Sequence, residues 1–310
     1  MNRPGKNILV VCGPNASGKT RLGVSLARPL NGEILSADSR QVYRGMDIGT
    51  GKDIEEYETA DGSVPYHLID IADPSEIYTV CDYQRDCYAA IESARSRGRL
   101  PIMVGGTGLY IEAVLKHYRI PAVPEDPALR KTLMRHSKEE LASRLHALDR
   151  DLFERTDRQS KKRIIRALEI GLQGAGRKKK TDIAPPQLHP LVLAVRWPRK
   201  ELVERIDARV ERRLAHGMVE EIRQLLKAGI DPDRFALFGM EYRHVARFIE
   251  GAVEYDKMVA GLKTDIHRLA KRQMTWFRGM ERRGIPVHWV DRADYASAMA
   301  IAGSEGMLLP

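Results

Sequence analysis

Short apolar runs alternate with amphipathic segments over the first third of the chain. Runs bounded by glycine or polar residues predict β-strands at residues 7–12, 32–38, 66–71 and 100–106. Apolar residues at helical spacing predict helices at 18–30 and 78–98. Strands that alternate with helices form a parallel sheet, which binds its ligands at the carboxyl ends of the strands. We therefore expect an α/β core with its site at that edge.

The pattern changes after about residue 117. Charged amphipathic helices are predicted at 121–136, 138–149 and 159–173, with no strand among them, and a strand pattern returns at 191–197. We interpret residues 1–116 and 191–293 as a discontinuous core, 117–190 as an all-helical insertion domain, and 294–310 as a tail that adds little. The basic run from Arg177 to Lys180 is interpreted as a mobile loop.

The positive charge is placed unevenly. The 310 residues carry a formal net charge of +9, yet residues 1–120 hold 14 Lys and Arg against 15 Asp and Glu, and the remainder holds 37 against 27. A basic field spread over many helices suits a polyanion such as nucleic acid, although solvated helix faces would give the same pattern.

The chain has no long apolar run and no secretory signal, so a cytoplasmic protein with no membrane partner is expected. Cys12, Cys81 and Cys87 lack metal-ligand spacing and are interpreted as thiols.

A glycine-rich loop between the first strand and the first helix is the strongest motif. It fits G-x-x-x-x-G-K-[ST], in which backbone N–H groups and a helix N-terminus cradle phosphates, the lysine adds a charge and the hydroxyl can hold Mg²⁺. Its residues are Gly13, Pro14, Asn15, Ala16, Ser17, Gly18, Lys19 and Thr20. The motif predicts phosphate binding, with Thr20 as the metal ligand, and leaves the identity of the phosphates open.

Asp38 follows the second predicted strand, which places it near the phosphate loop in a parallel sheet. A carboxylate there could bind Mg²⁺, accept a proton from an incoming nucleophile, or cap a helix. Spacing alone leaves these three alternatives open.

Six segments together resemble one family. They are GPNASGKT, SADSRQVYRGMDIGTGK, DYQRD, PIMVGGTGLY, RALEI and AKRQMTWFRG, and they occur in the order and at the intervals found in the bacterial tRNA dimethylallyltransferases, also called tRNA isopentenyltransferases. The resemblance covers about residues 8 to 290. It implies a P-loop NTPase-like parallel sheet flanked by helices, with an all-helical insertion domain.

The resemblance also implies a prenyltransferase. Such an enzyme holds the diphosphate of dimethylallyl diphosphate in the phosphate loop with Mg²⁺. It transfers the dimethylallyl group to N6 of the adenosine 3′ to the anticodon, position 37, in the anticodon stem-loop of tRNA, and releases diphosphate. By the same resemblance Asp38 accepts the proton of the amine, Lys19 stabilises the leaving group, Thr107 touches the diphosphate or the substrate edge, and Arg209 is directed at the diphosphate. Without it, Arg209 would be interpreted as a surface helix arginine.

The expected tRNA contacts come from three parts of the chain. Asp38, Ser39, Arg40, Gln41 and Thr107 would line the reaction channel; Arg130, Lys162, Arg163, Ile164, Ile165 and Arg166 belong to the insertion; Lys271, Arg272, Gln273 and Arg278 belong to the last long helix. Trp276 is assigned to the core, and a role for Gly239 to Arg243 in RNA binding is left open. Asn15 stands where this family usually has Thr, a change that leaves the backbone cradle intact.

Three other functions remain under consideration. A free-nucleotide isopentenyltransferase would have no use for the basic insertion, a small-metabolite kinase would leave residues 36–52 unexplained, and a non-catalytic RNA-binding protein would not need Lys19, Thr20 and Asp38 together. We expect the enzyme to be a monomer. The absence of a C-terminal zinc finger from the sequence favours the bacterial form.

Overall fold

The computed structural model describes residues 5–59, 62–121, 123, 125–174 and 184–307. The chain divides into two compact units, Met1–Tyr118 with Pro185–Pro310, and Arg119–Ala184. The second unit lies within the predicted insertion, and its boundary precedes residue 190 because strand β7 (Pro190–Arg196) already belongs to the sheet of the first unit. No helix in the described parts of the chain has the length and apolarity needed to cross a bilayer.

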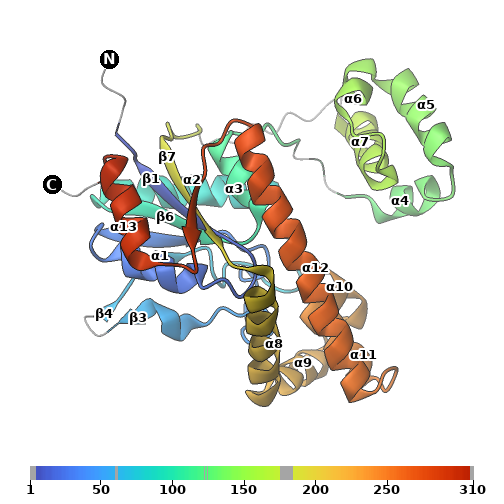
Figure 1. The fold of residues 1–310 in the computed structure, drawn as a ribbon. Helices are drawn as coiled ribbons and strands as arrows, with labels where there is room; N and C mark the ends of the chain where they lie inside the picture. The colour runs from blue at the N-terminus through green and yellow to red at the C-terminus, as the bar shows by residue number, and fades with distance from the viewer. Residues whose placement is uncertain (1–4, 60–61, 122, 124, 175–183, 308–310) are drawn as a thin grey trace. The chain divides into compact units, whose positions relative to one another are not determined.

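A six-stranded parallel sheet forms the centre of the first unit (Figure 1). This confirms the predicted fold class. Its strands, in spatial order, are β5 (Tyr66–His67), β2 (Gly32–Ser36), β6 (Leu100–Gly105), β1 (Ile8–Cys12), β7 and β8 (His288–Asp291). Every residue of β1 is fully buried, as expected for a central strand covered by helices on both faces.

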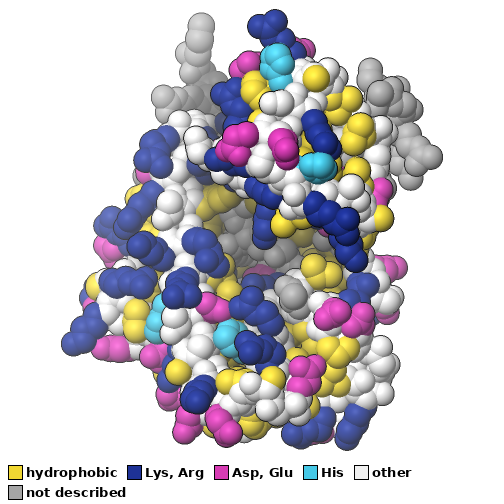
Figure 2. Space-filling view, turned by 90° about the vertical axis from the view of Figure 1, so that its right-hand side faces the viewer, with side chains coloured by type: hydrophobic (Ala, Val, Ile, Leu, Met, Phe, Trp, Pro, Cys, Tyr) yellow, Lys and Arg dark blue, Asp and Glu magenta, His cyan; other side chains and the backbone are white. Residues whose placement is uncertain are grey.

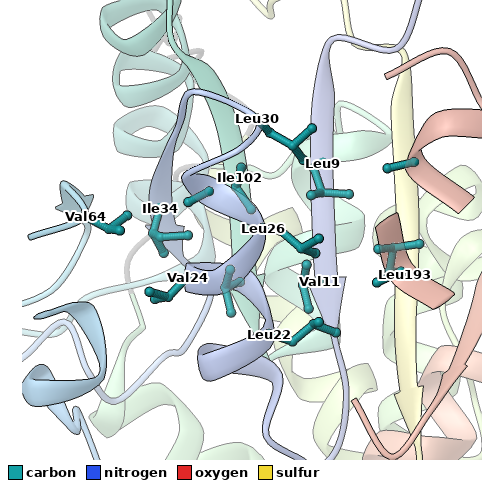
Figure 3. Close-up of a cluster of buried hydrophobic side chains, with 14 of the residues drawn as sticks. Leu9, Val11, Leu22, Val24, Leu26, Leu30, Ile34, Val64, Ile102 and Leu193 are labelled. Carbon is teal, nitrogen blue, oxygen red and sulfur yellow. The ribbon is translucent and has the colours of Figure 1, made fainter. Parts of the chain in front are cut away.

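Helices cover the two faces of the sheet. Helices α1 (Lys19–Ala27) and α13 (Tyr295–Ser304) pack on one face, where Leu22 and Leu26 of α1 meet Leu9, Val11 and Leu193 of the strands (Figure 3). Helices α2 (Val80–Ser96) and α3 (Gly108–Leu115) pack against β6. Helix α2 begins with a complete capping box, in which the Thr79 side chain accepts from the Asp82 N–H while Asp82 accepts from the Thr79 N–H.

The predicted strand at 66–71 is shorter than expected. Strand β5 ends at His67 because Leu68 and Asp70 adopt positive φ angles of 66° and 57°, which an extended strand cannot contain. Alternating polarity did not predict the two-stranded hairpin of β3 (Glu58–Thr59) and β4 (Gly62–Ser63), nor the 3₁₀ helix at Ile54–Tyr57 before it.

A helical layer follows β7, and it has its own apolar core. Its helices are α8 (Arg199–Ala215), α9 (Met218–Lys227), α10 (Phe235–Phe238), α11 (Met240–Ile249) and α12 (Tyr255–Arg282), with a 3₁₀ helix at Pro232–Arg234. Ile206, Ile222, Phe238, Tyr242 and Leu262 are fully or almost fully buried in this second cluster. The cluster includes Val42 and Met46, so it fixes the long segment that follows β2.

The expectation that residues 294–310 add little is wrong. Helix α13 places Ala298 and Ala302 in the main core, each with no exposed surface, and Met307 packs beside them. Because small and medium apolar side chains fill this face of the sheet, the C-terminal helix is part of the core.

The three cysteines are free thiols, as expected. Cys12 and Cys87 are buried, and burial raises the pKa of each thiol to about 12. Both side chains are therefore protonated, inert parts of the core.

The second unit consists of helices α4 (Pro127–Leu133), α5 (Lys138–Leu148), α6 (Arg150–Arg155) and α7 (Lys161–Gly174). Ile164 and Ile165 lie with Leu141, Leu145 and Leu168 in its core. Their assignment as tRNA contacts is wrong, because periodicity puts them on the buried face of α7 while Lys162 and Arg163 stay exposed.

Two more of the predicted tRNA contacts have structural partners. Glu169 is fully buried, accepts from Arg130 at 2.7 Å and 2.8 Å, and accepts from Arg166 at 3.1 Å. Burial opposes ionisation of Glu169, but Arg130 holds its pKa below the usual value. These arginines therefore hold the helical unit together, whatever else they bind. The basic run Arg177 to Lys180 lies outside the described residues.

Replacing Ile164 by Ala should destabilise the full chain by about 2–5 kcal/mol, because it removes buried methyl groups and leaves a cavity among the helices. Urea unfolding followed by far-UV circular dichroism measures the loss. The exposed neighbour Lys162→Ala is the control and should change stability by less than about 0.5 kcal/mol. Equal stability of the Ile164 variant and the wild type would contradict the assignment to the core.

Candidate active site

Three loops meet at the carboxyl ends of adjacent strands. The phosphate loop follows β1, the segment from Ala37 follows β2, and Gly106 and Thr107 follow β6. The second segment is bonded to β6 and to the loop after it, since the Ala37 N–H donates to the Val104 carbonyl of β6 at 2.7 Å and the Thr107 N–H donates to the Ala37 carbonyl at 3.1 Å. A Cβ at position 105 would lie 2.1 Å from the Ala37 carbonyl oxygen, so only glycine permits this approach.

Two distant side chains set the orientation of the phosphate loop. The Trp197 indole N–H donates to the Ser17 carbonyl, and Arg205 Nε donates to the Ala16 carbonyl, both at 2.9 Å. The Arg205 guanidinium also stacks 4.2 Å from the centroid of the Trp197 ring. With these carbonyls held from outside, and with no side chain capping α1, the N–H groups at the helix N-terminus stay available to an anion.

A cavity of about 350 Å³ opens beside this loop, within the first unit. All five residues expected to line the reaction channel are at its wall, together with three residues of the phosphate loop, Arg209 and two expected tRNA contacts of α12. They are Asn15, Lys19, Thr20, Asp38, Ser39, Arg40, Gln41, Thr107, Arg209, Arg272 and Gln273. The wall also includes Tyr57, Leu109, Glu241, Leu269 and Trp276.

The side chain of Lys19, the first residue of α1, lines the cavity beside the phosphate loop. Burial, with a smaller contribution from the positive charge of Arg209, lowers its pKa from 10.5 to about 8, while Asp38 and Glu56 oppose the shift. Because desolvation disfavours the charged form of Lys19, an anionic ligand beside it would stabilise the ammonium. The phosphate loop is therefore poised for a negatively charged group.

Asp38 lies in a turn and caps no helix. Its Oδ1 accepts from the Arg40 N–H at 3.0 Å, and residues 39–45 form turns without a helix. Thr107 fixes the neighbouring residue, because its Oγ1 accepts from the Ser39 N–H at 3.0 Å. The helix-cap alternative for Asp38 is thereby excluded, which leaves a carboxylate that lines the cavity together with Lys19 and Thr20.

Arg209 reaches the phosphate loop from α8. Its Nη1 donates to Asn15 Oδ1 at 3.0 Å, and its Nη2 pairs with Asp53. Arg213, one turn further on, is almost fully buried with its Nη2 3.8 Å from Asp53. Burial raises the pKa of Asp53, but Arg209 and Arg213 outweigh it and lower that pKa overall. Asp53 is thus an ionised counterion that holds both arginines.

Arg213 has an unusual environment. Burial lowers its pKa to about 10, with a further contribution from the charge of Arg209. Its guanidinium occupies the space where a Cβ of Gly51 would stand. The glycine in the G-T-G-K part of the second motif therefore allows α8 to pack against the segment that carries Asp38.

The rest of this segment is held by buried polar groups. Glu221 of α9 accepts from the backbone N–H groups of Asp47, Ile48 and Gly49 at 2.9, 2.6 and 3.0 Å, and from the Tyr242 hydroxyl at 2.8 Å. The buried Lys52 Nζ donates to the Tyr43 carbonyl at 2.9 Å and pairs with Asp47 and Asp70. These bonds explain why so long a segment holds one conformation without secondary structure.

Arg40 and Gln41 have partners inside the protein. Arg40 pairs with the buried Glu241 at 3.0 Å, and Gln41 donates to the Gly51 carbonyl at 2.8 Å. A Cβ at Gly239, where φ is 136°, would lie 2.8 Å from the Arg40 guanidinium carbon. The segment Gly239 to Arg243 therefore supports the cavity wall from within, through Arg40 and Glu241.

Helix α12 supplies the opposite wall. Trp276, which we assigned to the core, is only half-buried and lines the cavity, where its ring fills the space beside Gly108. The indole N–H has no partner among the described residues. The fully buried aromatic residue of the pair is Phe277. Helical periodicity could not decide which of two adjacent aromatic residues faces a cavity.

The remaining predicted tRNA contacts are exposed cations. Lys271, Arg272 and Arg278 lie on the exposed side of α12, while Lys162 and Arg163 lie on α7. Arg163 pairs with Asp157 at 2.6 Å. Figure 2 shows many Lys and Arg side chains, with acidic side chains among them, on the face seen there.

Sequence reasoning missed several residues that shape the site. Asp53 could have been found from the sequence, because it directly follows the second motif. No sequence motif marks the other residues, since each reaches the site only through the tertiary fold. They are Trp197, Arg205, Arg213, Glu221 and Glu241.

Comparisons with known proteins agree with this geometry. Residues 41–280 match the model of the family described as IPP transferase. A protein of Bacteroides fragilis strain YCH46 named tRNA dimethylallyltransferase 2 is 49% identical over 294 residues, covering 94% of each chain. One of Geotalea uraniireducens named tRNA dimethylallyltransferase 1 is 48% identical over 285 residues, covering 92% of each.

Solved structures show the same similarity. The tRNA isopentenylpyrophosphate transferase of Bacillus halodurans has a TM-score of 0.67 and 34% identity, over 97% of this chain and 95% of that one. A eukaryotic dimethylallyltransferase acting on tRNA has a TM-score of 0.77 and 25% identity, over 97% and 79%. The family model matches most of the chain, and relatives with about half of their residues identical cover nearly its whole length. The chain therefore belongs to the IPP transferase family.

Proposed function

We propose that the protein is a tRNA dimethylallyltransferase. It transfers the dimethylallyl group of dimethylallyl diphosphate to N6 of the adenosine at position 37 of tRNA, 3′ to the anticodon, and releases diphosphate. The observation that carries the proposal is one cavity walled by a phosphate loop with Lys19 on one side and by the free carboxylate of Asp38 on another. Such a cavity brings a leaving group and a proton acceptor together.

The phosphate loop supplies the leaving-group half of the reaction. As the bond from the allyl carbon to oxygen breaks, negative charge grows on the diphosphate and positive charge spreads over the allyl carbons. The N–H groups at the start of α1, Lys19 and Arg209 stabilise the diphosphate as it leaves. Fixed donors of this kind lower a barrier by about 3 kcal/mol each.

Mg²⁺ fits this site through Thr20. Its hydroxyl lines the cavity next to Lys19, and no group of three or more His, Cys, Asp or Glu suited to a metal occurs among the described residues. Mg²⁺ commonly takes one or two protein oxygens and completes its shell with phosphate oxygens and water. When bound, the ion would neutralise charge on the diphosphate.

Asp38 supplies the acceptor half. The exocyclic amine of adenine is a weak nucleophile because its lone pair is delocalised into the ring, so a nearby base must take its proton as it attacks. The carboxylate of Asp38 lines the cavity and is oriented by the Arg40 N–H. Thr107 and Ser39 fix the adjoining backbone. This arrangement supports general-base catalysis.

A base in a tRNA loop must leave its stack to enter such a cavity, and proteins compensate by holding the backbone and offering a stacking surface. Exposed cations on α12 and α7 suit the phosphates, and the cavity-facing ring of Trp276 suits a base. We place the enzyme in the cytoplasm, where tRNA is modified, and expect it to act as a monomer.

The direct test uses dimethylallyl diphosphate labelled in the allyl group, Mg²⁺, and either tRNA, AMP or ATP as the second component. Label should enter tRNA alone. Asp38→Asn should lower kcat by about 10²- to 10⁴-fold, the usual contribution of a general base, and leave diphosphate and tRNA affinity within a few-fold. Unchanged turnover of this variant would refute the role of Asp38, and ATP-dependent phosphorylation of an acceptor would refute the transferase.

Diphosphate affinity should fall with pH above about 8. Because the pKa of Lys19 is about 8 in the free protein and a bound anion raises it, binding takes up a proton in this range. Below pH 8 the ammonium is already charged, so its contribution becomes independent of pH. Above pH 8, by linkage, the Kd for diphosphate should rise by up to about tenfold per pH unit.

Titration calorimetry with Mg²⁺ and pyrophosphate, from pH 7 to about 10, measures this change. Lys19→Arg is the control, because its side chain stays charged and the titration of the ligand itself is common to both proteins. Parallel pH profiles for the two proteins would contradict the assignment.

Charge reversal on α12 should weaken tRNA binding in a salt-dependent manner. Lys271 and Arg272 are exposed and bond to no described side chain. Arg163 and Arg166 form ion pairs within the helical unit. The double variant Lys271→Glu/Arg272→Glu therefore disturbs the fold less than a change at Arg163 or Arg166. The slope of log affinity against log salt should fall by about 2. Lys257→Glu, at the other end of the same helix, should leave the slope unchanged. An affinity loss independent of salt would contradict phosphate contacts.

A further inference from the structure

One N–H group of the phosphate loop is already engaged by a side chain from α12. The Asn15 N–H donates to Gln273 Oε1 at 2.9 Å, although the two residues are 258 positions apart. Pro14 has no N–H, and the Ser17 N–H donates to the Pro14 carbonyl at 3.3 Å. No other hydrogen bond in the described structure uses the N–H groups of Ala16, Gly18, Lys19 and Thr20. The free donors are thus those nearest the start of α1.

Gln273 is held from both ends of its carboxamide. While Oε1 accepts from Asn15, Nε2 donates to the Gly106 carbonyl at 2.9 Å. A Cβ at Gly106 would lie 2.5 Å from Gln273 Nε2 and 3.6 Å from Lys19 Cε, so the side chains of Gln273 and Lys19 both lie against this glycine. The side chain therefore bridges the phosphate loop and the β6–α3 loop, and it cannot move away without losing both bonds.

This bridge limits how far a chain of phosphates can extend. Loops of this motif bind successive phosphoryl groups along a row of backbone donors. Here the free N–H donors lie toward the start of α1. At the other end of the row the Asn15 N–H is already bonded to Gln273 Oε1, and the Gln273 side chain stands at that part of the cavity wall. A third phosphoryl group in that direction would displace the carboxamide, and both Asn15 and Gly106 would lose their partner.

We propose that Gln273 is the specificity-determining residue that limits the phosphate loop to a diphosphate and excludes nucleoside triphosphates. The inference rests on the proposed function, in which the donor is a prenyl diphosphate. It answers the question that the motif leaves open, since G-x-x-x-x-G-K-[ST] is the loop that most often holds ATP or GTP. It also gives Gln273 a role distinct from the tRNA contact that we expected.

The test compares the binding of pyrophosphate and tripolyphosphate, each with Mg²⁺, by titration calorimetry on the full-length chain. Tripolyphosphate carries more charge, so a basic site without a limit would bind it more tightly. The wild type should prefer pyrophosphate by at least about tenfold, and Gln273→Ala should reduce that preference by at least about tenfold, through tighter binding of tripolyphosphate and of ATP.

Two further variants isolate the effect. Gln273→Ser keeps a polar group but cannot span the two loops, so it should relax the preference in the same direction. Thr275→Ala lies on the exposed side of the same helix, bonds only to the Lys271 carbonyl, and should keep the ratio of the wild type. Thermal unfolding of each variant reports whether it is folded.

The outcomes are distinguishable. An unchanged ratio in both Gln273 variants, or equal losses for the two ligands, would overturn the proposal, because a side chain that only stiffens the loop affects both ligands alike. A wild type without preference for pyrophosphate would also overturn it. If the wild type does not bind pyrophosphate at all, the proposed donor itself fails.

Discussion

The site depends on the way in which the carbonyls of Ala16 and Ser17 are bonded from outside the cavity by Arg205 and Trp197. These bonds anchor the loop by its carbonyls, while no side chain caps α1 and the N–H groups at its start stay available to an anion. Both partners follow β7, the strand with which the chain returns to the sheet after the helical unit. The residues that complete the loop therefore lie about 180 positions from it, and the discontinuous core is a requirement of the site.

Charge balance is the second element of the architecture. Lys19, Arg209 and Arg213 are brought close together, which is unfavourable without anions, and the carboxylates of Asp38, Asp53 and Glu56 compensate for part of this charge. Burial, and after it the charge of Arg209, lowers the pKa of Lys19, and a bound diphosphate would neutralise the remaining positive charge. Unlike Asp53, which pairs with two arginines, Asp38 accepts from a backbone N–H and lines the cavity, an arrangement that suits a proton acceptor.

The sequence predicted local features well and long-range ones poorly. The apolar runs at 7–12, 32–38 and 100–106 became β1, β2 and β6, and parallel topology then placed Lys19, Asp38 and Thr107 at one edge. Trp276 was assigned wrongly to the core, and the bonds of Gln273 to two loops were not predicted, because only tertiary packing decides which side of α12 meets the cavity. Ile164 and Ile165 were assigned wrongly as tRNA contacts because they stand among cations in the sequence, whereas the helical period of α7 places them on its buried face.

The central claim is that the phosphate loop holds the diphosphate of a prenyl donor while Asp38 stays free to face the acceptor. A crystal structure with Mg²⁺ and pyrophosphate tests it most directly. We predict pyrophosphate on the N–H groups of Ala16, Gly18, Lys19 and Thr20, with the Gln273 bridge to Asn15 intact and Asp38 in contact with neither the ion nor the ligand. Pyrophosphate bound elsewhere, or Asp38 as a ligand of the metal, would contradict the account.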